Sequence, residues 1–244
     1  MIRMPPSSLH RKDYVPGGPF EHTITTLTPI PPYDFDLTAA YDTYFRGHYG
    51  AEWYHDGVFR RPLDLGDRVC LVQIRSLGSV GSPSLEVDLK CAAPNDAVVS
   101  AVRRQVARLL GIDQELAPFY QMALKDPALA SIAQGLRGLH IPQAPSVWEA
   151  LVLGILGQQV SAHMARILRT LLVQTYGHSI KDSGSTYHTF PSPEILMEAG
   201  TKGLQSIKLI VSIRKYDNVC FMSLTFGIAH SSRLSSSQAT LSPE

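Results

Sequence analysis

Two adjacent glutamines, Gln158 and Gln159, stand where two apolar helical patterns meet, in the stretch LGILGQQVSAHMARIL. One interpretation is a solvated turn in which Ser161 is an ordinary helix cap. The other is chemical, because a helix start presents backbone N–H groups that can hold a phosphate, and Arg166 adds a positive charge one turn later. Side chains at such a junction can enter a nucleic-acid groove while Ser161 and Arg166 contact the backbone.

The chain offers few other groups for chemistry. Ser161 and His163 are two residues apart, so on a helix they do not face each other as a nucleophile and its base. Cys70, Cys91 and Cys220 are widely spaced and predict neither a disulfide framework nor a zinc site. The sequence shows no nucleophile elbow, phosphate-binding loop, dinucleotide fingerprint or metal-ligand cluster. We therefore expect no metal and no cofactor.

The composition indicates a globular protein with a core of ordinary size. The chain has 244 residues, 44% of them hydrophobic and 18% charged. A formal net charge of +1 gives no general argument for nucleic acid, so that argument depends on local patches. The N-terminus has no apolar secretory segment, and no apolar run is long enough to span a membrane. We expect an intracellular monomer without a membrane partner, nuclear if eukaryotic and cytoplasmic if bacterial.

The elements that position the glutamine pair fall into four segments. Residues 1–21, rich in Pro, Gly and basic residues, are expected to form a flexible arm. Residues 22–112 predict a small α+β domain with an antiparallel sheet half-covered by helices. Residues 113–218 predict an all-α domain, and the Ser-rich tail 219–244 does not resemble a folded ending.

Local signals define the first domain. The stretch TITTLT predicts a strand, and Asp36 is expected to cap a helix that carries Tyr41. Asp56 and Gly57 predict a type I′ hairpin turn. The stretch SLEVDLKC alternates between apolar and polar residues, which is typical of a half-buried strand. Asn95 or its neighbour is expected to cap an amphipathic helix after it.

The second domain begins with two short helices, predicted over ELAPFYQMALKD and PALASIAQGLRG. Ser146 and Glu149 form a capping box at the start of the helix that leads to the glutamines. Ser161 is expected to cap the next helix and Gly177 to end it. HSIKDSGSTYHT is expected to be a polar loop, and SPEILMEAG a last helix with a glycine stop.

At this point the sequence resembles a known family. PSVWEALVLGILGQQVSAHMARILRTLLVQTYG resembles the first helices of the helix-hairpin-helix DNA glycosylase domain, and the nearest type is 3-methyladenine DNA glycosylase II. PPYDF, GLHIPQAPSVWEA and FPSPEILMEAGTKGLQSIKL resemble further family segments in the same order, so the resemblance covers Pro31 to Asn218. It implies a DNA-repair enzyme that flips alkylated bases out of double-stranded DNA and hydrolyses the N-glycosidic bond without a cofactor.

The resemblance carries over to few residues. Gln158 and Gln159 fall at the family's wedge, the side chains that fill the space left by the flipped nucleotide. Family members vary at the second position, where an apolar wedge also occurs. Tyr41 falls where the N-terminal domain offers an aromatic ring to the base pocket, and a core tyrosine on a helix is an equal interpretation.

The sequence departs from the family towards its C-terminus. The family has a Gly-hydrophobic-Gly hairpin that holds a DNA phosphate, followed by an aspartate that stabilises the cationic sugar. No Gly-x-Gly follows residue 218, and Asp217, the last aspartate, precedes the place of the hairpin. We therefore name no catalytic residue and expect the chain to be C-terminally incomplete and inactive alone. A non-catalytic DNA-binding or regulatory fragment and a non-functional truncated product are the alternatives. A half-complete helical domain is expected to expose Leu168, Leu171 and Ile195.

Overall fold

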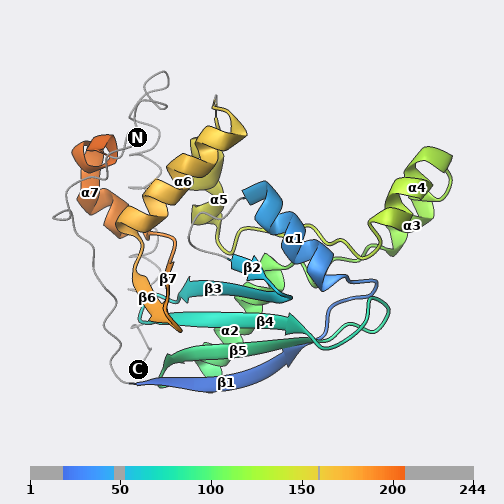
Figure 1. Cartoon of the computed structure of the whole chain (residues 1–244), viewed down its shortest axis with the longest axis horizontal. Coiled ribbons are helices and arrows are strands. Elements are labelled where there is room, and N and C mark those ends of the chain that lie inside the picture. The colour runs from blue at the N-terminus through green and yellow to red at the C-terminus, as the bar shows by residue number, and fades with distance from the viewer. Residues whose placement is uncertain (1–18, 47–52, 159, 207–244) are drawn as a thin grey trace, which may run out of the picture.

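The computed structural model describes residues 19–46, 53–158 and 160–206 of the chain. A five-stranded sheet lies beside a group of helices (Figure 1). The elements in chain order are β1 (Phe20–Leu27), α1 (Phe35–Arg46), β2 (Trp53–His55), β3 (Val58–Asp64), β4 (Val69–Ser76), β5 (Leu85–Ala92), α2 (Asp96–Leu109), α3 (Ala117–Ala123), α4 (Pro127–Gly135), α5 (Val147–Gly157), α6 (Ala162–Tyr176), β6 (Ser179–Asp182), β7 (Ser185–His188) and α7 (Pro193–Ser206).

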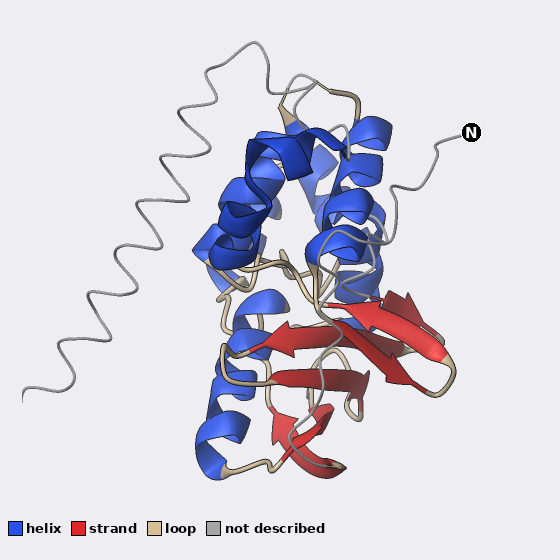
Figure 2. Ribbon diagram, turned by 90° about the vertical axis from the view of Figure 1, so that its left-hand side faces the viewer, coloured by secondary structure: helices blue, strands red, loops and turns tan. Residues whose placement is uncertain are grey.

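The large sheet has the strand order β1-β5-β4-β3-β2, and every neighbouring pair is antiparallel. Strand β5 alternates as its sequence predicts, with Leu85, Val87 and Leu89 fully buried on one face. These side chains share one hydrophobic core with the buried face of α2. Seen from the side, most helical turns form a layer above the strands (Figure 2). The predicted α+β class with an antiparallel N-terminal sheet is confirmed.

The turn and cap signals of the first domain are mostly correct. Asp56 and Gly57 have φ of 51° and 70°, as a type I′ turn between β2 and β3 requires. The Asn95 side chain accepts the N–H of Val98 at 3.0 Å and caps α2. The predicted cap of α1 is wrong by two residues, because it is Asp34 that accepts the N–H of Leu37, at 2.9 Å.

The N-terminal boundary of the sheet domain also differs from its prediction. Strand β1 begins at Phe20, and Phe20 and Glu21 pair with Ala92 and Cys91 of β5. The predicted arm therefore loses its last two residues to the sheet, since the ladder with β5 continues to the end of that strand. Residues 1–18 of the predicted arm and the tail 219–244 lie outside the described residues.

The segment expected to be a polar loop is a two-stranded hairpin, β6–β7. Its turn residues Ser183 and Gly184 have φ of 48° and 80°, the same pattern as the first hairpin. Asp182 binds the ammonium group of Lys90 on β5 at 3.0 and 3.1 Å, so the hairpin is attached to the large sheet. The prediction was wrong because both strands are mostly polar in sequence, with Ser179 and His188 buried despite their polarity, and show no apolar alternation.

The prediction that the last described helix, α7, ends at Gly200 is only partly correct. Gly200 has φ 57° and ψ −173°, which breaks the helical geometry as a glycine stop does. A second helical piece then continues to Ser206, so the element is kinked and does not end there. The side chain of Leu204, in this second piece, is buried.

The expected exposure of apolar residues in the helical part is wrong in its details. Leu168 is only 4% exposed, and Leu171 and Ile195 are half-buried. Helices α5, α6 and α7 bury apolar residues in one cluster, and Ile195 packs against it. Its members are Val152, Leu156, Leu172, Tyr176, Leu196 and Leu204. The strongly exposed apolar residues of α5 and α6 are instead Val147 and Met164, and several others lie on and next to α3 and α4.

Chain segments 32–38 and 138–140 join the two parts of the fold. His140 is fully buried, and its ring nitrogens lie 2.6 Å from the carbonyl oxygen of Gly111 and 3.0 Å from that of Pro32. The N–H of Asp34 donates to the carbonyl oxygen of Gly138 at 2.8 Å. These contacts bring the chain back to the sheet domain after α4.

Gly138 is expected to be required at this joint. It has φ of 90°, and a Cβ atom there would lie 2.7 Å from the backbone nitrogen of Asp34. Gly138→Ala should therefore lower the free energy of unfolding by about 1–3 kcal/mol, measured by urea titration. Gly135→Ala is the matched control, because nothing lies within 4 Å of its Cβ position. Equal unfolding midpoints for the two variants would contradict the assigned strain.

Candidate functional site

The junction of α5 and α6 is built by two helix ends that meet. Gln158 follows α5 in an extended conformation, with φ −71° and ψ 130°, and its N–H donates to the carbonyl oxygen of Ile155 at 3.1 Å. Its side chain is exposed, so it is available to a ligand. Gln159 lies outside the described residues, and its predicted role stays a prediction.

Ser161 begins α6 as the sequence predicts. Its hydroxyl accepts the N–H of Met164 at 3.2 Å, and its carbonyl oxygen accepts the N–H of Ala165 at 2.9 Å. The first amides of a helix have no partner within the helix, and capping by Ser161 uses only one of them. The start of α6 therefore combines an ordinary cap with amides that can bind an anionic oxygen.

The two arginines of α6 have different surroundings. Arg166 is exposed, one turn from the junction, where its guanidinium group can reach a phosphate. Arg169 is half-buried, and its Nη2 atom lies 3.5 Å from the carbonyl oxygen of Leu153 and close to Gly157. Arg169 thus contacts the last turns of α5 and supports the angle between the two helices, a role the sequence did not reveal.

The structure brings three of the predicted site residues together: Gln158, Ser161 and Arg166 all belong to the α5–α6 junction. Tyr41 belongs to α1, which contacts β2 and β4, and its side chain is half-buried. Both earlier interpretations of Tyr41, a base-pocket residue and a core residue, fit this position. Its role in a base pocket stays a prediction.

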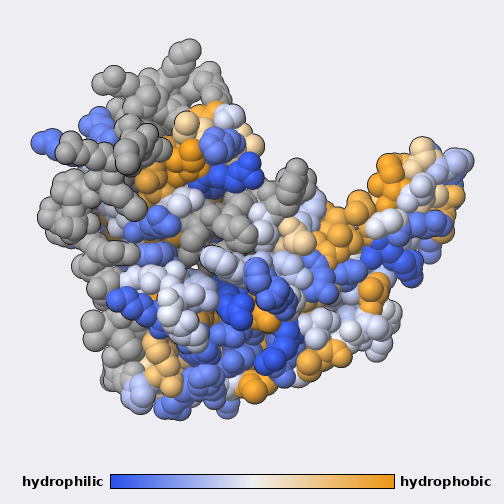
Figure 3. All heavy atoms as spheres, viewed as in Figure 1, coloured by the Kyte–Doolittle hydropathy of each residue, from blue (hydrophilic) through white to orange (hydrophobic). Residues whose placement is uncertain are grey.

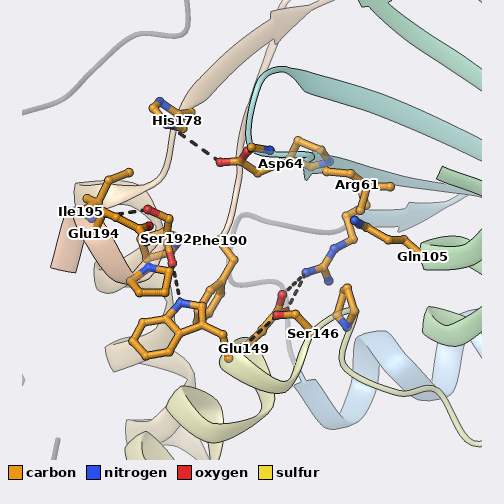
Figure 4. Close-up of a pocket in the computed structure, with 17 residues that line it drawn as sticks. Arg61, Asp64, Gln105, Ser146, Glu149, His178, Phe190, Ser192, Glu194 and Ile195 are labelled. Carbon is orange, nitrogen blue, oxygen red and sulfur yellow. Dashed lines mark hydrogen bonds and ion pairs between the residues drawn. The ribbon is translucent and has the colours of Figure 1, made fainter. Parts of the chain in front are cut away.

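A cavity of about 470 Å³ lies between the sheet domain and the starts of α5 and α7 (Figure 4). Its lining includes Arg61, Trp148, Glu149 and His178. This cavity is separate from the glutamine junction, because Glu149 and Gln158 are at opposite ends of α5, roughly 13 Å of helical rise apart.

The cavity contains a buried ion pair that the sequence analysis missed. The Arg61 Nη2 atom lies 2.7 Å from each carboxylate oxygen of Glu149, and the two side chains are 2% and 4% exposed. The predicted capping box is therefore only half correct. Ser146 does accept the N–H of Glu149, but the Glu149 carboxylate binds a guanidinium group from β3. The sequence does contain an indication that Arg61 is buried. Alternate residues of a strand share a face, and Arg61 alternates with the buried residues Phe59 and Leu63.

Three other ionisable side chains, those of Tyr54, Cys70 and Cys91, have a pKa that burial raises. Burial, and then a hydrogen bond to the Asp36 carboxylate, raise the pKa of Tyr54. Burial also raises the pKa of the Cys70 and Cys91 thiols, so both remain protonated inside the sheet core. Cys220 lies outside the described residues. Within the three described ranges, no group of three His, Cys, Asp or Glu side chains is arranged to hold a metal ion.

The groups at the α5–α6 junction suit the binding of an anionic ligand. The junction offers an exposed amide side chain, a helix start and a guanidinium group, which suit a nucleic-acid groove and its phosphates. The part of the chain from Glu149 to Asp182 contains no other Asp or Glu, and both of these carboxylates are bound to cations of the sheet.

In the part that the structure describes, no helix is both long and apolar enough to cross a membrane.

Comparison with known proteins defines the class of this fold. No family model matches the chain. A 3-methyladenine DNA-glycosylase from Archaeoglobus fulgidus superposes with a TM-score of 0.64 at 22% identity, covering 80% of this chain and 67% of the other. An MBOgg1 structure in complex with a low-affinity DNA ligand superposes with a TM-score of 0.60 at 18% identity, covering 85% and 66%. The fold is therefore that of DNA glycosylases.

Sequence relatives agree with this class. The DNA-3-methyladenine glycosylase of Bacillus subtilis is 36% identical over 105 residues, which are 43% of this chain and 35% of the relative. The DNA-3-methyladenine glycosylase 2 of Escherichia coli is 26% identical over 182 residues, 75% and 60% of the two chains. These relatives are members of the helix-hairpin-helix DNA glycosylase superfamily, which the chain resembles in sequence and in fold. The matches of the chain span about a third and about three-fifths of these two relatives.

Proposed function

We propose that this chain binds double-stranded DNA that contains damaged bases, through the α5–α6 junction, in the manner of a base-excision repair glycosylase. The observation that carries the proposal is the exposed Gln158, held in an extended conformation between the end of α5 and the Ser161-capped start of α6. An amide side chain there can enter the minor groove while the helix start and Arg166 hold phosphates.

The comparisons support the choice of ligand. The curated relatives are named for 3-methyladenine, an alkylated base, and one structural relative is described with a DNA ligand. We propose that the corresponding ligand of this chain is a duplex with an alkylated base. The chain binds this DNA as a monomer. Flipping a base costs a few kcal/mol, roughly, and a side chain that fills the vacated stack offsets part of that cost.

Base excision is a separate step, and we do not assign it to the 244-residue chain. The family's reaction needs a carboxylate close to the sugar of the flipped nucleotide, to stabilise the positive charge that develops there. Glu149 and Asp182, the carboxylates at the two ends of the α5–α6 segment, are engaged by Arg61 and Lys90. We propose that the chain recognises damaged DNA without cleaving the glycosidic bond.

The wedge role of the glutamines predicts a selective loss of binding. A variant with Gln158→Ala and Gln159→Ala should bind a duplex with an abasic-site analogue about 10-fold more weakly, or ~1.4 kcal/mol, than the parent chain does. Its binding to undamaged duplex should change much less, because only the open site leaves room for the wedge. An amide can also hydrogen-bond the orphaned partner base, which an alanine cannot. Fluorescence anisotropy with both duplexes measures the difference.

The matched control is Gln174→Ala, an exposed glutamine further along α6 and away from the junction. It should leave the affinity for both duplexes unchanged. If the junction variant and the control behave alike on both duplexes, the glutamines only form a solvated turn, and the proposed wedge is wrong.

A further inference from the structure

Cys70 on β4 and Cys91 on β5 are neighbours in the large sheet. The ladder between these strands pairs Leu71 with Lys90, and the same register places Cys70 opposite Cys91, one residue further along. Both side chains are fully buried in the core of the sheet domain. The spacing of the cysteines in the sequence gave no indication of this contact, because only the strand register brings the two residues together.

The two cysteines belong to the covered face of the sheet. In Figure 1, α2 lies behind the strands, and the face of the molecule in Figure 3 is mostly hydrophilic over them. Glu86, Asp88 and Lys90 of β5 belong to that hydrophilic face, because they alternate with the buried residues of the strand. Cys91 follows the buried alternation and shares one core with Cys70 and with the buried residues of α2.

The position of the pair suits the geometry of a disulfide. Directly opposite residues of antiparallel strands have Cα atoms about 4.5–5.5 Å apart, and a disulfide joins Cα atoms about 4.4–6.8 Å apart. The two thiols already contact each other through a hydrogen bond, and neither is in a disulfide. A bond between the two sulfur atoms therefore needs no large movement of the strands.

Arg68 places a positive charge beside the two thiols. Its guanidinium group donates to the carbonyl oxygens of Ala92 and Ala93, at 3.5 and 2.9 Å, directly after Cys91 in the chain. The charge of Arg68 acts on both thiols. A neighbouring cation favours the thiolate, which is the form of cysteine that reacts with oxidants.

The surroundings distinguish the two sulfur atoms. Burial raises the pKa of the Cys91 thiol, while the hydrogen bond from Cys70 and the charge of Arg68 lower it, and Glu21 and Asp67 raise it to a smaller extent. On Cys70, burial, the negative charge of a Cys91 thiolate and the hydrogen bond to Cys91 all raise the pKa. Cys91 is therefore the sulfur that ionises first, with Cys70 as the hydrogen-bond donor beside it.

The pair lies close to the end of its strands, where a small oxidant can enter. Leu71 and Lys90 are the last pair of the β4–β5 ladder, and the turn before β4 contains the exposed residues Gly66 and Asp67. Strand ends open locally at a lower free-energy cost than unfolding of the whole domain. Hydrogen peroxide is close to water in size, so we expect such an opening to admit it and to exclude bulky oxidants.

We propose that Cys70 and Cys91 are a redox-active pair, which hydrogen peroxide converts to a reversible disulfide between β4 and β5. The Cys91 thiolate attacks one peroxide oxygen and becomes a sulfenic acid, and the hydroxide that leaves takes up the proton that Cys91 released. The Cys70 sulfur then attacks the Cys91 sulfur, and the sulfenic oxygen leaves as water with the Cys70 proton. Two thiols are oxidised to one disulfide, and one peroxide is reduced to two waters.

This pair is separate from the α5–α6 junction, and the proposal does not depend on DNA binding. A dithiol reverses the reaction by thiol–disulfide exchange and restores both thiols. Because few thiolates are present in a buried pair, we expect a slow reaction, which responds to sustained exposure to peroxide.

Peptide mass spectrometry of the 244-residue chain tests the proposal. The reduced, folded chain is exposed to excess hydrogen peroxide, and its remaining thiols are alkylated in urea before digestion. We expect a peptide pair that is linked through Cys70 and Cys91 and that dithiothreitol separates. Cys220→Ser should form the same link to the same extent. Circular dichroism shows that the chain stays folded during the exposure.

Two cysteine variants test the order of the two steps. Cys70→Ser should stop the reaction at a sulfenic acid on Cys91, which dimedone traps. Cys91→Ser should leave Cys70 largely unmodified under the same conditions. If either variant is unfolded, the linkage map of the parent chain and of Cys220→Ser decides the proposal.

A charge variant tests the role of Arg68. Arg68→Met should slow formation of the link at least about 3-fold, because the thiolate loses its neighbouring cation. Arg75→Met is the matched control, since Arg75 lies towards the other end of β4 in an exposed pair with Glu86, and it should leave the rate unchanged.

A folded parent chain without a Cys70–Cys91 link after hours of exposure, the slow limit of uncatalysed disulfide formation, overturns the proposal. A link that forms only when the chain is unfolded by urea overturns it as well, and so does equal linkage of either cysteine to Cys220. Equal rates for Arg68→Met and Arg75→Met would contradict the part of the proposal that makes Cys91 the reactive sulfur.

Discussion

Replacement of Glu149 by alanine is expected to lower the free energy of unfolding by about 3–5 kcal/mol. The Arg61 guanidinium group would remain charged and only 2% exposed, without the carboxylate that now lies 2.7 Å away. Arginine does not lose its proton in a protein, so the variant cannot relieve the charge by deprotonation. The penalty is the desolvation of a cation that has lost its counter-ion.

Urea unfolding followed by circular dichroism measures this effect, and an exposed pair supplies the matched control. Arg75 and Glu86 lie 2.6 Å apart on neighbouring strands, but the Arg75 side chain is 57% exposed. Glu86→Ala should therefore change stability by less than about 1 kcal/mol. A double variant with Arg61→Met and Glu149→Met should recover most of the lost stability, because it removes both charges together. Equal losses for Glu149→Ala and Glu86→Ala would show that the buried pair is not a strong determinant of stability.

The Arg61–Glu149 pair is linked to the candidate site through helix α5. Glu149 lies in the first turn of α5, and Gln158 follows the last turn of the same helix. The pair therefore fixes the start of α5 to β3, while Asp182 and Lys90 attach the β6–β7 hairpin to β5. These two ion pairs hold the helices that form the junction in a defined orientation on the sheet.

The sequence predicted those elements in which one local rule dominates. Alternation defined β5, because one face of the strand is buried and the other is not. Side-chain caps identified the starts of α2, α5 and α6, because Asn95, Ser146 and Ser161 each satisfy a backbone amide of their own helix. At the candidate site, the same local reasoning placed Ser161 at the start of α6, as the structure has it.

Features that depend on distant partners were missed. The β6–β7 hairpin is stabilised by Lys90, 92 residues before Asp182, and its own sequence has no apolar alternation. Arg61 finds its partner 88 residues later, so its burial could only be suspected from its phase in the strand. Leu168 was expected to be exposed because the helical domain was predicted to be half-complete, and the apolar pattern of a single helix does not show which neighbours bury it.

The 244-residue chain is expected to release alkylated bases from DNA at least about a thousand-fold more slowly than a complete glycosylase, which is the scale of losing an electrostatic stabiliser of the transition state. The departing base leaves positive charge on the sugar, and a carboxylate close to that sugar lowers the barrier. The only carboxylates between residues 149 and 182 are the two at the ends of that segment. Each is bound to a cation of the sheet domain, and the first is roughly 13 Å of helical rise from Gln158.

The measurement is the formation of abasic sites in a duplex that contains one 3-methyladenine or 7-methylguanine, detected as strand breaks after treatment with alkali. The Bacillus subtilis relative serves as the active reference, because it is 36% identical over the matched 105 residues. Binding of the same chain to the duplex with an abasic-site analogue shows independently that the junction engages DNA. Binding without excision supports the proposal that the 244-residue chain recognises damage without cleaving the glycosidic bond. Excision at a rate near that of the relative would mean that a carboxylate elsewhere reaches the sugar, and Asp217 would then be the first residue to replace by asparagine.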